Sequence, residues 1–208
     1  MAALVLLMRH PSVLNKVETE LKDAGLMHGC EIPPRALTWA DLGQLTYLNA
    51  VIKETLRLWP SASLGTWRRT HRDTKICGYV VPAGCTVGLC PCAVDINKAV
   101  YGEDAEEFRP DRWLSVQACE PECGHTKTSD MHNVKSLKEP FAFSMGPRDC
   151  VGQSLARMEM QVFLATMLSH FQLHLAPRMG SPEEVLSSIR YHITLCMPQG
   201  LWMKVVPR

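Results

Sequence analysis

The chain has 208 residues, a length that allows one large domain or two small ones. Its formal net charge is +1, so the charge balance gives no indication of a nucleic-acid partner, and 46% of its residues are hydrophobic, as in an ordinary globular protein. The cysteines are odd in number and irregular in spacing, which favours reduced thiols in an intracellular compartment over a disulfide framework.

The first part of the chain is predicted to be helical. The apolar stretch 1–8 is too short to cross a membrane and lacks the basic residues that open a signal peptide, so we expect the last turns of a helix there. Pro11 suits the first turn of a second helix, which Gly25 ends. Apolar residues at helical spacing predict a further helix over 42–59, closed by Pro60.

Short strands and irregular segments are expected next. Three β-type runs lie at 65–70, 74–81 and 85–90, with turn residues at Gly78, inside the second run, and at 82–84. A short helix is expected over 97–101, and the polar stretch 114–140 is expected to be a surface loop of the same domain.

The last part of the chain combines a helix with strands. After Cys150 the apolar residues, Leu155 and Val162 among them, predict a helix buried on more than one side. The stretch 191–207 is predicted to be a two-stranded hairpin with its turn at 197–200. The fold class that we expect is therefore α+β, mainly helical with small β-sheets, in one domain over residues 1–208.

The most informative motif lies at 143–152 and has the pattern F-x-x-G-x-R-x-C-x-G. Cys150 comes just before a predicted helix, where unpaired N–H groups and the positive dipole end favour a thiolate, the form of cysteine that binds metals. Gly146 and Gly152 suit places where the backbone approaches a flat macrocycle closely or adopts a positive φ. The alternative is a buried structural cysteine before an ordinary helix.

This loop, continued by Leu155, Ala156 and Glu159, resembles the haem-thiolate loop of the cytochrome P450 superfamily. The resemblance implies that Cys150 is the axial ligand of a haem iron and that Arg148 pairs with a haem propionate. It also implies a propionate contact for Arg68, with Arg69 as the second choice, and a substrate pocket lined by 61–66 and 197–201. The haem-binding residues that it implies are Arg68, Phe143, Gly146, Arg148, Cys150 and Gly152.

Glu54 and Arg57 form an E-x-x-R pair on a predicted helix, where a spacing of three residues makes them neighbours. Exposed pairs of this kind are common and contribute little. However, 47–60 resembles the K helix of cytochromes P450, in which the two charges are buried and joined by a downstream arginine, here Arg112. We therefore expect Arg57 and Arg112 each to fork onto Glu54 as one network. Three solvated charges are the alternative.

A zinc site is a further alternative for part of the polar stretch. Cys119, Cys123 and His125, with His132 nearby, supply zinc-type donors, although C-x3-C-x-H is looser than the tight C-x2-C knuckle.

The resemblance implies an oxidoreductase that inserts one oxygen atom from O2 into a small apolar organic substrate, with electrons from NADPH through a reductase or other redox partner. It covers about the C-terminal half of the family's catalytic domain, without the distal helix that manages protons or the membrane anchor of most eukaryotic members. We therefore expect a fragment that is not competent by itself, from an intracellular and membrane-associated protein. The alternatives are a haem-thiolate isomerase or dehydratase acting on peroxides, and a non-catalytic haem-binding remnant.

Overall fold

The computed structural model describes residues 1–29, 33–114, 139–192 and 194–208. The helices in these ranges are α1 (Ala2–Arg9), α2 (Pro11–Asp23), α3 (Trp39–Gln44), α4 (Thr46–Leu58), α5 (Pro91–Asp95), α6 (Lys98–Tyr101), α7 (Gln153–His170) and α8 (Pro182–Ser187), with short 3-10 turns η1 (Pro110–Trp113), η4 (Phe141–Phe143) and η5 (Pro177–Met179). The strands are β1 (Thr66–Arg69), β2 (Thr74–Ile76), β3 (Tyr79–Val81), β4 (Thr86–Leu89), β5 (Phe171–Leu175), β6 (Arg190–Tyr191), β7 (Leu195–Cys196) and β8 (Met203–Pro207). The prediction of a mainly helical α+β fold with small sheets is confirmed.

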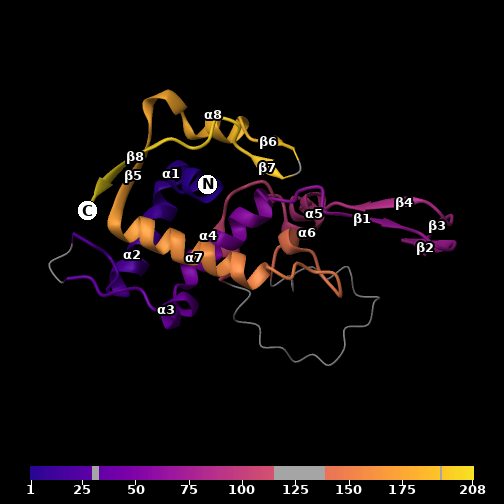
Figure 1. The fold of residues 1–208 in the computed structure, drawn as a ribbon, viewed down its shortest axis with the longest axis horizontal. Helices are drawn as coiled ribbons and strands as arrows, with labels where there is room; N and C mark the ends of the chain where they lie inside the picture. The colour runs from indigo at the N-terminus through magenta and orange to yellow at the C-terminus, as the bar shows by residue number, and fades with distance from the viewer. Residues whose placement is uncertain (30–32, 115–138, 193) are drawn as a thin grey trace.

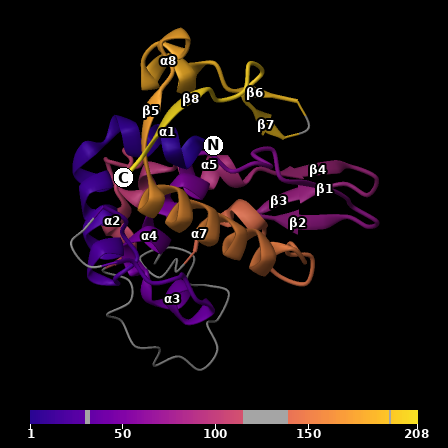
Figure 2. The same cartoon turned by 60° about the vertical axis from the view of Figure 1, so that its left-hand side comes forward.

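The core lies among α1, α2, α4 and α7, which pack against one another (Figures 1 and 2). On α2 the buried residues Val13, Val17 and Leu21 recur every four positions, so they form one apolar stripe. The helices α4 and α7 add further buried aliphatic side chains, such as Leu48 and Leu168. Among the described helices, none combines the length and the apolar character that a membrane crossing requires.

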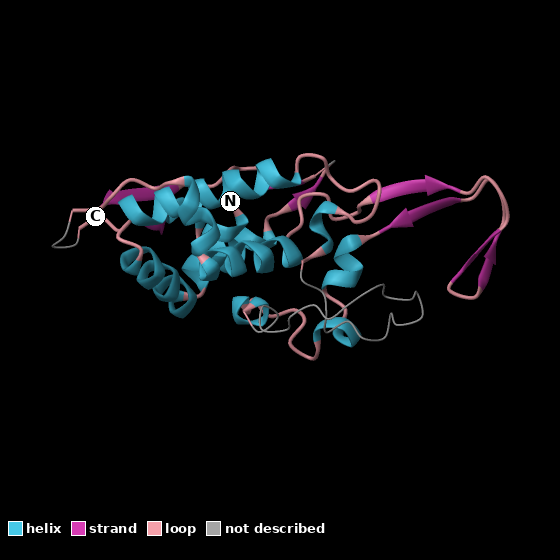
Figure 3. Cartoon of the chain, turned by 90° about the horizontal axis from the view of Figure 1, so that it is seen from below, coloured by secondary structure: helices cyan, strands magenta, loops and turns pink. Residues whose placement is uncertain are grey.

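Two antiparallel strand pairs project from this helical body, one beyond the other (Figures 1 and 3). The outer hairpin joins β2 to β3, and the inner ladder pairs β1 with β4. Cys77 and Gly78 both have positive φ between β2 and β3, which is the backbone that a two-residue hairpin turn with the right twist requires. The predicted turn at Gly78 is therefore present.

The prediction of a C-terminal hairpin over 191–207 is wrong. The strand β8 pairs with β5, which follows α7 directly, while β7 pairs with β6 (Figure 2). The turn at 197–200 does form, because Gly200 N–H donates to Met197 O at 2.9 Å, but it links strands of two different sheets. Leu173 and Leu175 of β5 pack against the core, and this long-range burial decides the pairing.

Two helix predictions also need correction. Residues 42–59 form two helices, because Leu45 leaves helical geometry at φ −75° and ψ 70°, and a capping box of Thr38 and Asp41 starts α3 separately. The helix after Cys150 is buried only toward its C-terminal end. Leu155 and Val162, which we expected to be buried, are exposed, whereas Met160 in the same half of α7 packs against the core.

Candidate functional site

Cys150 lies at the end of a compact loop that runs from η4 to α7. Its backbone N–H donates to Phe143 O at 2.9 Å, so the loop closes on itself. Ser144 and Gly146 make the reversal with φ of 64° and 82°. The Cys150 side chain is exposed, and the residue stands shortly before the first turn of α7, with Gln153 N–H donating to Cys150 O at 3.1 Å. A sulfur placed here is open to an incoming ligand and close to the positive end of a helix.

Exposed apolar side chains lie close to Cys150 in the chain. Met145, Val151 and Leu155 all have exposed side chains on the loop and on the first turn of α7. The loop and α7 also contribute Phe143 and Ala156 to a hollow of about 420 Å³, lined by Leu56, Ser61, Ala142, Phe143, Ala156, Glu159, Met160 and Phe163. This environment suits a large, flat and mainly apolar ligand better than it suits a small hydrated ion.

The arginines that we expected at a haem propionate have exposed side chains. Arg148 is exposed on the loop. Arg68 lies on β1 opposite Val87, and its guanidinium donates to its own neighbour, Trp67 O, at 3.0 Å. Arg69 donates to Gly84 O at 3.3 Å.

Glu54 and Arg57 lie completely buried beside the loop, with 0% of each side chain exposed. Arg57 forks onto the carboxylate, with Nε to Oε2 at 2.9 Å and Nη2 to Oε1 at 2.8 Å. Arg112 reaches Oε1 through Nε alone at 2.9 Å, and its Nη2 donates to Asp104 O. The structure therefore brings the three charges together, but with one fork instead of the two that we expected.

Backbone and aromatic groups complete this buried cluster. Glu54 also accepts from Trp113 Nε1 at 2.8 Å and from Arg109 N–H at 3.0 Å. The remaining N–H groups of Arg57 donate to three backbone carbonyls, those of Asp95, Ala105 and Glu107. All five guanidinium donors of Arg57 are thus used, which is the condition under which a buried ion pair stabilises a fold.

Comparison with known proteins decides the family, because the sequence profile described as Cytochrome P450 matches residues 1–197. The chain belongs to the cytochrome P450 family. Cytochrome P450 CYP13A1 of Caenorhabditis elegans is 29% identical to it over 99% of this chain and 35% of that protein. Cytochrome P450 monooxygenase ALT8 of Alternaria alternata is 30% identical over 98% of this chain and 37% of its own length.

The fold is likewise that of a cytochrome P450. The crystal structure of CYP102L1, a cytochrome P450, has a TM-score of 0.73 with this chain at 27% identity, covering 100% of this chain and 41% of the other. The chain therefore spans well under half of the length of each of these three proteins.

The residues around Cys150 fit the haem that the P450 family implies. In the described part of the chain, no three of its His, Cys, Asp and Glu side chains converge to hold a bare metal ion. A haem needs fewer protein ligands than a bare metal ion, because the porphyrin itself supplies four ligands and the protein only an axial one. One exposed thiol next to apolar surface matches that need. The zinc alternative, with Cys119, Cys123, His125 and His132, lies outside the described residues.

Two acidic residues that the sequence did not single out hold the base of the P450 cysteine loop. Glu139 bridges Lys53 of α4 at 2.8 Å and Arg157 of α7 at 2.6 Å. Asp95, at the end of α5, is completely buried, and its Oδ1 accepts from Phe141 N–H of η4 at 3.3 Å. Neither residue belongs to a local sequence pattern, so their roles can be recognised only from their contacts in the three-dimensional structure.

The two segments expected to line a substrate pocket do meet. Leu195 N–H donates to Ser61 O at 2.8 Å, and Ser61 and Met197 both line a small hollow of about 150 Å³. The structure thus brings the start of the segment 61–66 next to the start of the segment 197–201.

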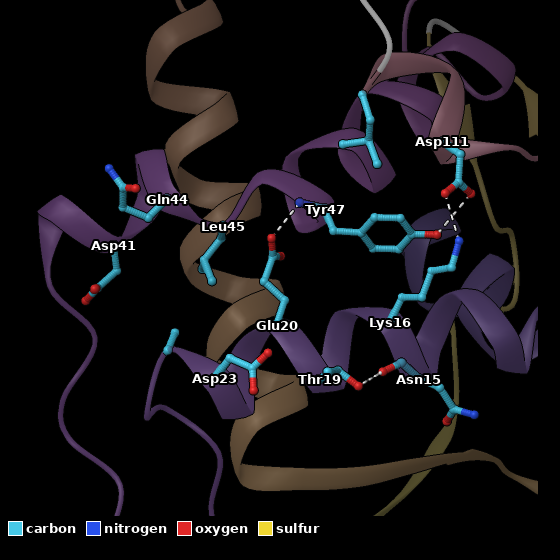
Figure 4. Close-up of a pocket in the computed structure, with 12 residues that line it drawn as sticks. Asn15, Lys16, Thr19, Glu20, Asp23, Asp41, Gln44, Leu45, Tyr47 and Asp111 are labelled. Atoms are coloured by element: carbon cyan, nitrogen blue, oxygen red, sulfur yellow. Dashed lines mark hydrogen bonds and ion pairs between the residues drawn. The ribbon is translucent and has the colours of Figure 1, made fainter. Parts of the chain in front are cut away.

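A larger hollow, of about 710 Å³, lies away from the cysteine, between α2, α3, α4 and η1 (Figure 4). Some of its polar side chains bind one another or the backbone of a neighbouring helix. Lys16 binds Asp111 at 2.7 Å, which raises the pKa of the Lys16 ammonium, and Glu20 accepts from Tyr47 N–H at 2.7 Å, capping α4. These contacts hold helices together, so the hollow has a structural explanation.

Proposed function

We propose that this chain is the haem-ligating portion of a haem-thiolate monooxygenase, with Cys150 as the axial ligand. The observation that carries the proposal is the Cys150 thiol itself, exposed at the end of a self-closed loop just before α7. The thiol stands next to the start of α7, the positive end of the helix dipole. Haem bound there supplies the oxidative chemistry, and the chain supplies the ligand, the orientation and part of the water exclusion.

Several residues of the chain have defined tasks in this proposal. Phe143 fixes the backbone of Cys150 through its carbonyl, and the exposed side chains of Val151 and Leu155 would offer apolar contact to a flat ligand. The cations of Arg148 and Arg68 are exposed and carry the donors that carboxylate groups of the ligand need. The cluster of Glu54, Arg57 and Arg112 keeps the wall behind the loop rigid.

The reaction class and the partners belong to the same proposal. The substrate is a small apolar organic molecule, oxidised with O2 and with electrons from NADPH delivered by a reductase or other redox partner. The Alternaria relative is named a monooxygenase, which supports this class over an isomerase or dehydratase. Turnover that depends on NADPH and a reductase, measured on a protein with the full family length, separates these classes.

We further propose that residues 1–208 do not catalyse this reaction alone. Cys150, Val151 and Leu155 are exposed, so a ligand at this place would face solvent. Oxygen chemistry requires a closed pocket and ordered proton delivery. Oxygenated product from this chain, reconstituted with haem and supplied with NADPH and a reductase, would contradict the proposal.

The ligand assignment is tested by absorption spectroscopy on the haem-reconstituted chain. The ferrous carbon monoxide complex of the wild type should show the thiolate-type band, and Cys150→Ala should lose it. Cys77→Ser, which alters another exposed cysteine, is the matched control and should keep it. If Cys150→Ala kept the band and Cys77→Ser lost it, the assignment to Cys150 would be wrong.

A further inference from the structure

Asp95 is a completely buried carboxylic acid between the Glu54–Arg57–Arg112 cluster and the cysteine loop. On one side its backbone carbonyl accepts from Arg57 Nη1 at 2.5 Å. On the other side its Oδ1 accepts from Phe141 N–H at 3.3 Å and from the Tyr101 hydroxyl at 3.1 Å. Its Oδ2 has no hydrogen-bond partner among the described residues.

These contacts connect two parts of the site that are far apart in sequence. Phe141 is the first residue of η4, and the carbonyl of Phe143, at the end of η4, accepts from Cys150 N–H. The helix α5 packs against both α4 and η4. A continuous series of hydrogen bonds and one short turn therefore runs from Arg57 through Asp95 to the backbone of Cys150.

We propose that Asp95 is a positioning residue that sets the place of the cysteine loop relative to the buried Arg57. Its consequence for haem ligation rests on the function proposed above. The unpartnered Oδ2 supports a specific role, because an apolar side chain would fill this buried place without leaving a polar atom unsatisfied. Burial raises the pKa of the Asp95 carboxyl to about 6, which agrees with that cost.

The test compares three variants of the 208-residue chain by amide hydrogen exchange. Asp95→Ala removes the acceptor for Phe141 N–H, and exchange over 141–150 should rise about tenfold, the effect of losing one to two buried hydrogen bonds. Asp95→Asn keeps an oxygen at the Oδ1 position and should restore protection. Asp111→Ala is the control, since that residue bonds to Lys16 and Tyr47 and not to the loop.

Three results would overturn the proposal. Exchange over 141–150 that is unchanged in Asp95→Ala would exclude a positioning role. An equal rise in α2 and α7 would show a general loss of stability. If Asp95→Ala does not fold, Asp95→Asn decides: loss of protection over 141–150 in that variant would mean that the retained acceptor is not what holds the loop.

A spectroscopic readout separates this proposal from the assignment of Cys150. With haem, Asp95→Ala should lower the fraction of thiolate-type carbon monoxide complex, and Asp95→Asn should recover it. A wild-type chain without the thiolate-type band would refute the proposed function, while the exchange data would still decide the role of Asp95.

An independent observation concerns Cys90 and Cys92, which the proposed function does not use. Their sulfur atoms lie 3.2 Å apart at the junction of β4 and α5, and both residues are half-buried. Cys90 Sγ also lies 3.5 Å from Ser63 O. A disulfide needs about 2.05 Å between sulfurs, so an approach of about 1.2 Å by side-chain rotation would join them.

We infer that Cys90 and Cys92 form a dithiol site that a low-molecular-weight disulfide oxidises. The Cys90 thiolate attacks the reagent, forms a mixed disulfide and releases the first thiol. Cys92 then loses its proton and attacks Cys90 Sγ, releasing the second thiol, so one disulfide is reduced to two thiols. Burial and the hydrogen bond with Cys90 raise the pKa of the Cys92 thiol to about 11, which agrees with a role for Cys92 in the second step.

Oxidised glutathione is the probe, with peptide mass mapping as the measurement. The peptide that contains both cysteines should lose two hydrogens and carry no adduct. Cys92→Ser should instead retain one glutathione on Cys90, and Cys77→Ser should leave the link unchanged. Adducts on both residues of the wild type, or no reaction at either, would overturn the inference.

Discussion

The sharpest test of the buried cluster is the replacement of Arg57, because the structure shows which hydrogen bonds each substitution removes. Arg57 makes five hydrogen bonds with its side chain, two to Glu54 and three to backbone carbonyls. Arg57→Ala removes all five and leaves the Glu54 carboxylate buried with fewer donors. Loss of one partner of a buried ion pair typically costs about 3–5 kcal/mol of the free energy of unfolding.

Arg57→Lys keeps the charge but changes the geometry. A lysine ammonium has three donors, so at least two of the five hydrogen bonds cannot form. At about 0.5–1.5 kcal/mol for each lost bond, Arg57→Lys should cost about 1–3 kcal/mol. The free energy of unfolding should therefore decrease in the order wild type, Arg57→Lys, Arg57→Ala.

Urea unfolding followed by tryptophan fluorescence measures these losses, since Trp113 Nε1 donates to Glu54 and reports on the cluster directly. Arg35→Ala is the control. Arg35 also pairs bidentately with a carboxylate, that of Asp41, but its side chain is 48% exposed. Its removal should shift the unfolding midpoint far less. If Arg57→Ala and Arg35→Ala lowered stability equally, the cluster would behave as surface charge, and the reasoning from burial would be refuted.

Three further outcomes are expected. Burial raises the folded-state pKa of Asp95 to about 6 from 3.8, so the folded state binds this proton more tightly than the unfolded state does. The free energy of unfolding should therefore fall as the pH rises from about 4 to 6. Urea unfolding of Asp95→Asn should lack this part of the pH profile. Gly146→Ala places a side chain at φ 82° and should cost about 1–2 kcal/mol, whereas Gly152→Ala, where φ is −87°, should cost less in the same thermal melts. Glu139→Gln should lower stability by at most about 1 kcal/mol, and the loss should shrink in high salt because the two ion pairs are partly exposed.

The features predicted correctly from the sequence depend on short-range patterns. The turn at Gly78 follows from the need for positive φ between two short strands. The contact of Glu54 with Arg57 follows from helical spacing. Phe143, Gly146 and Cys150 lie within one short segment of the chain, so their order in the loop can be read from the sequence. The resemblance to the P450 family rests on that order.

The features that only the tertiary structure decided all involve partners distant in the chain. The strand β8 has two possible neighbours, and the burial of Leu173 and Leu175 selects β5, which no local pattern in 191–207 records. Asp95 looks like an ordinary helix-end residue until Arg57 and Phe141 meet it from 38 and 46 positions away. Local propensity acts over a few residues, whereas burial and hydrogen bonding depend on which segments the whole fold brings together.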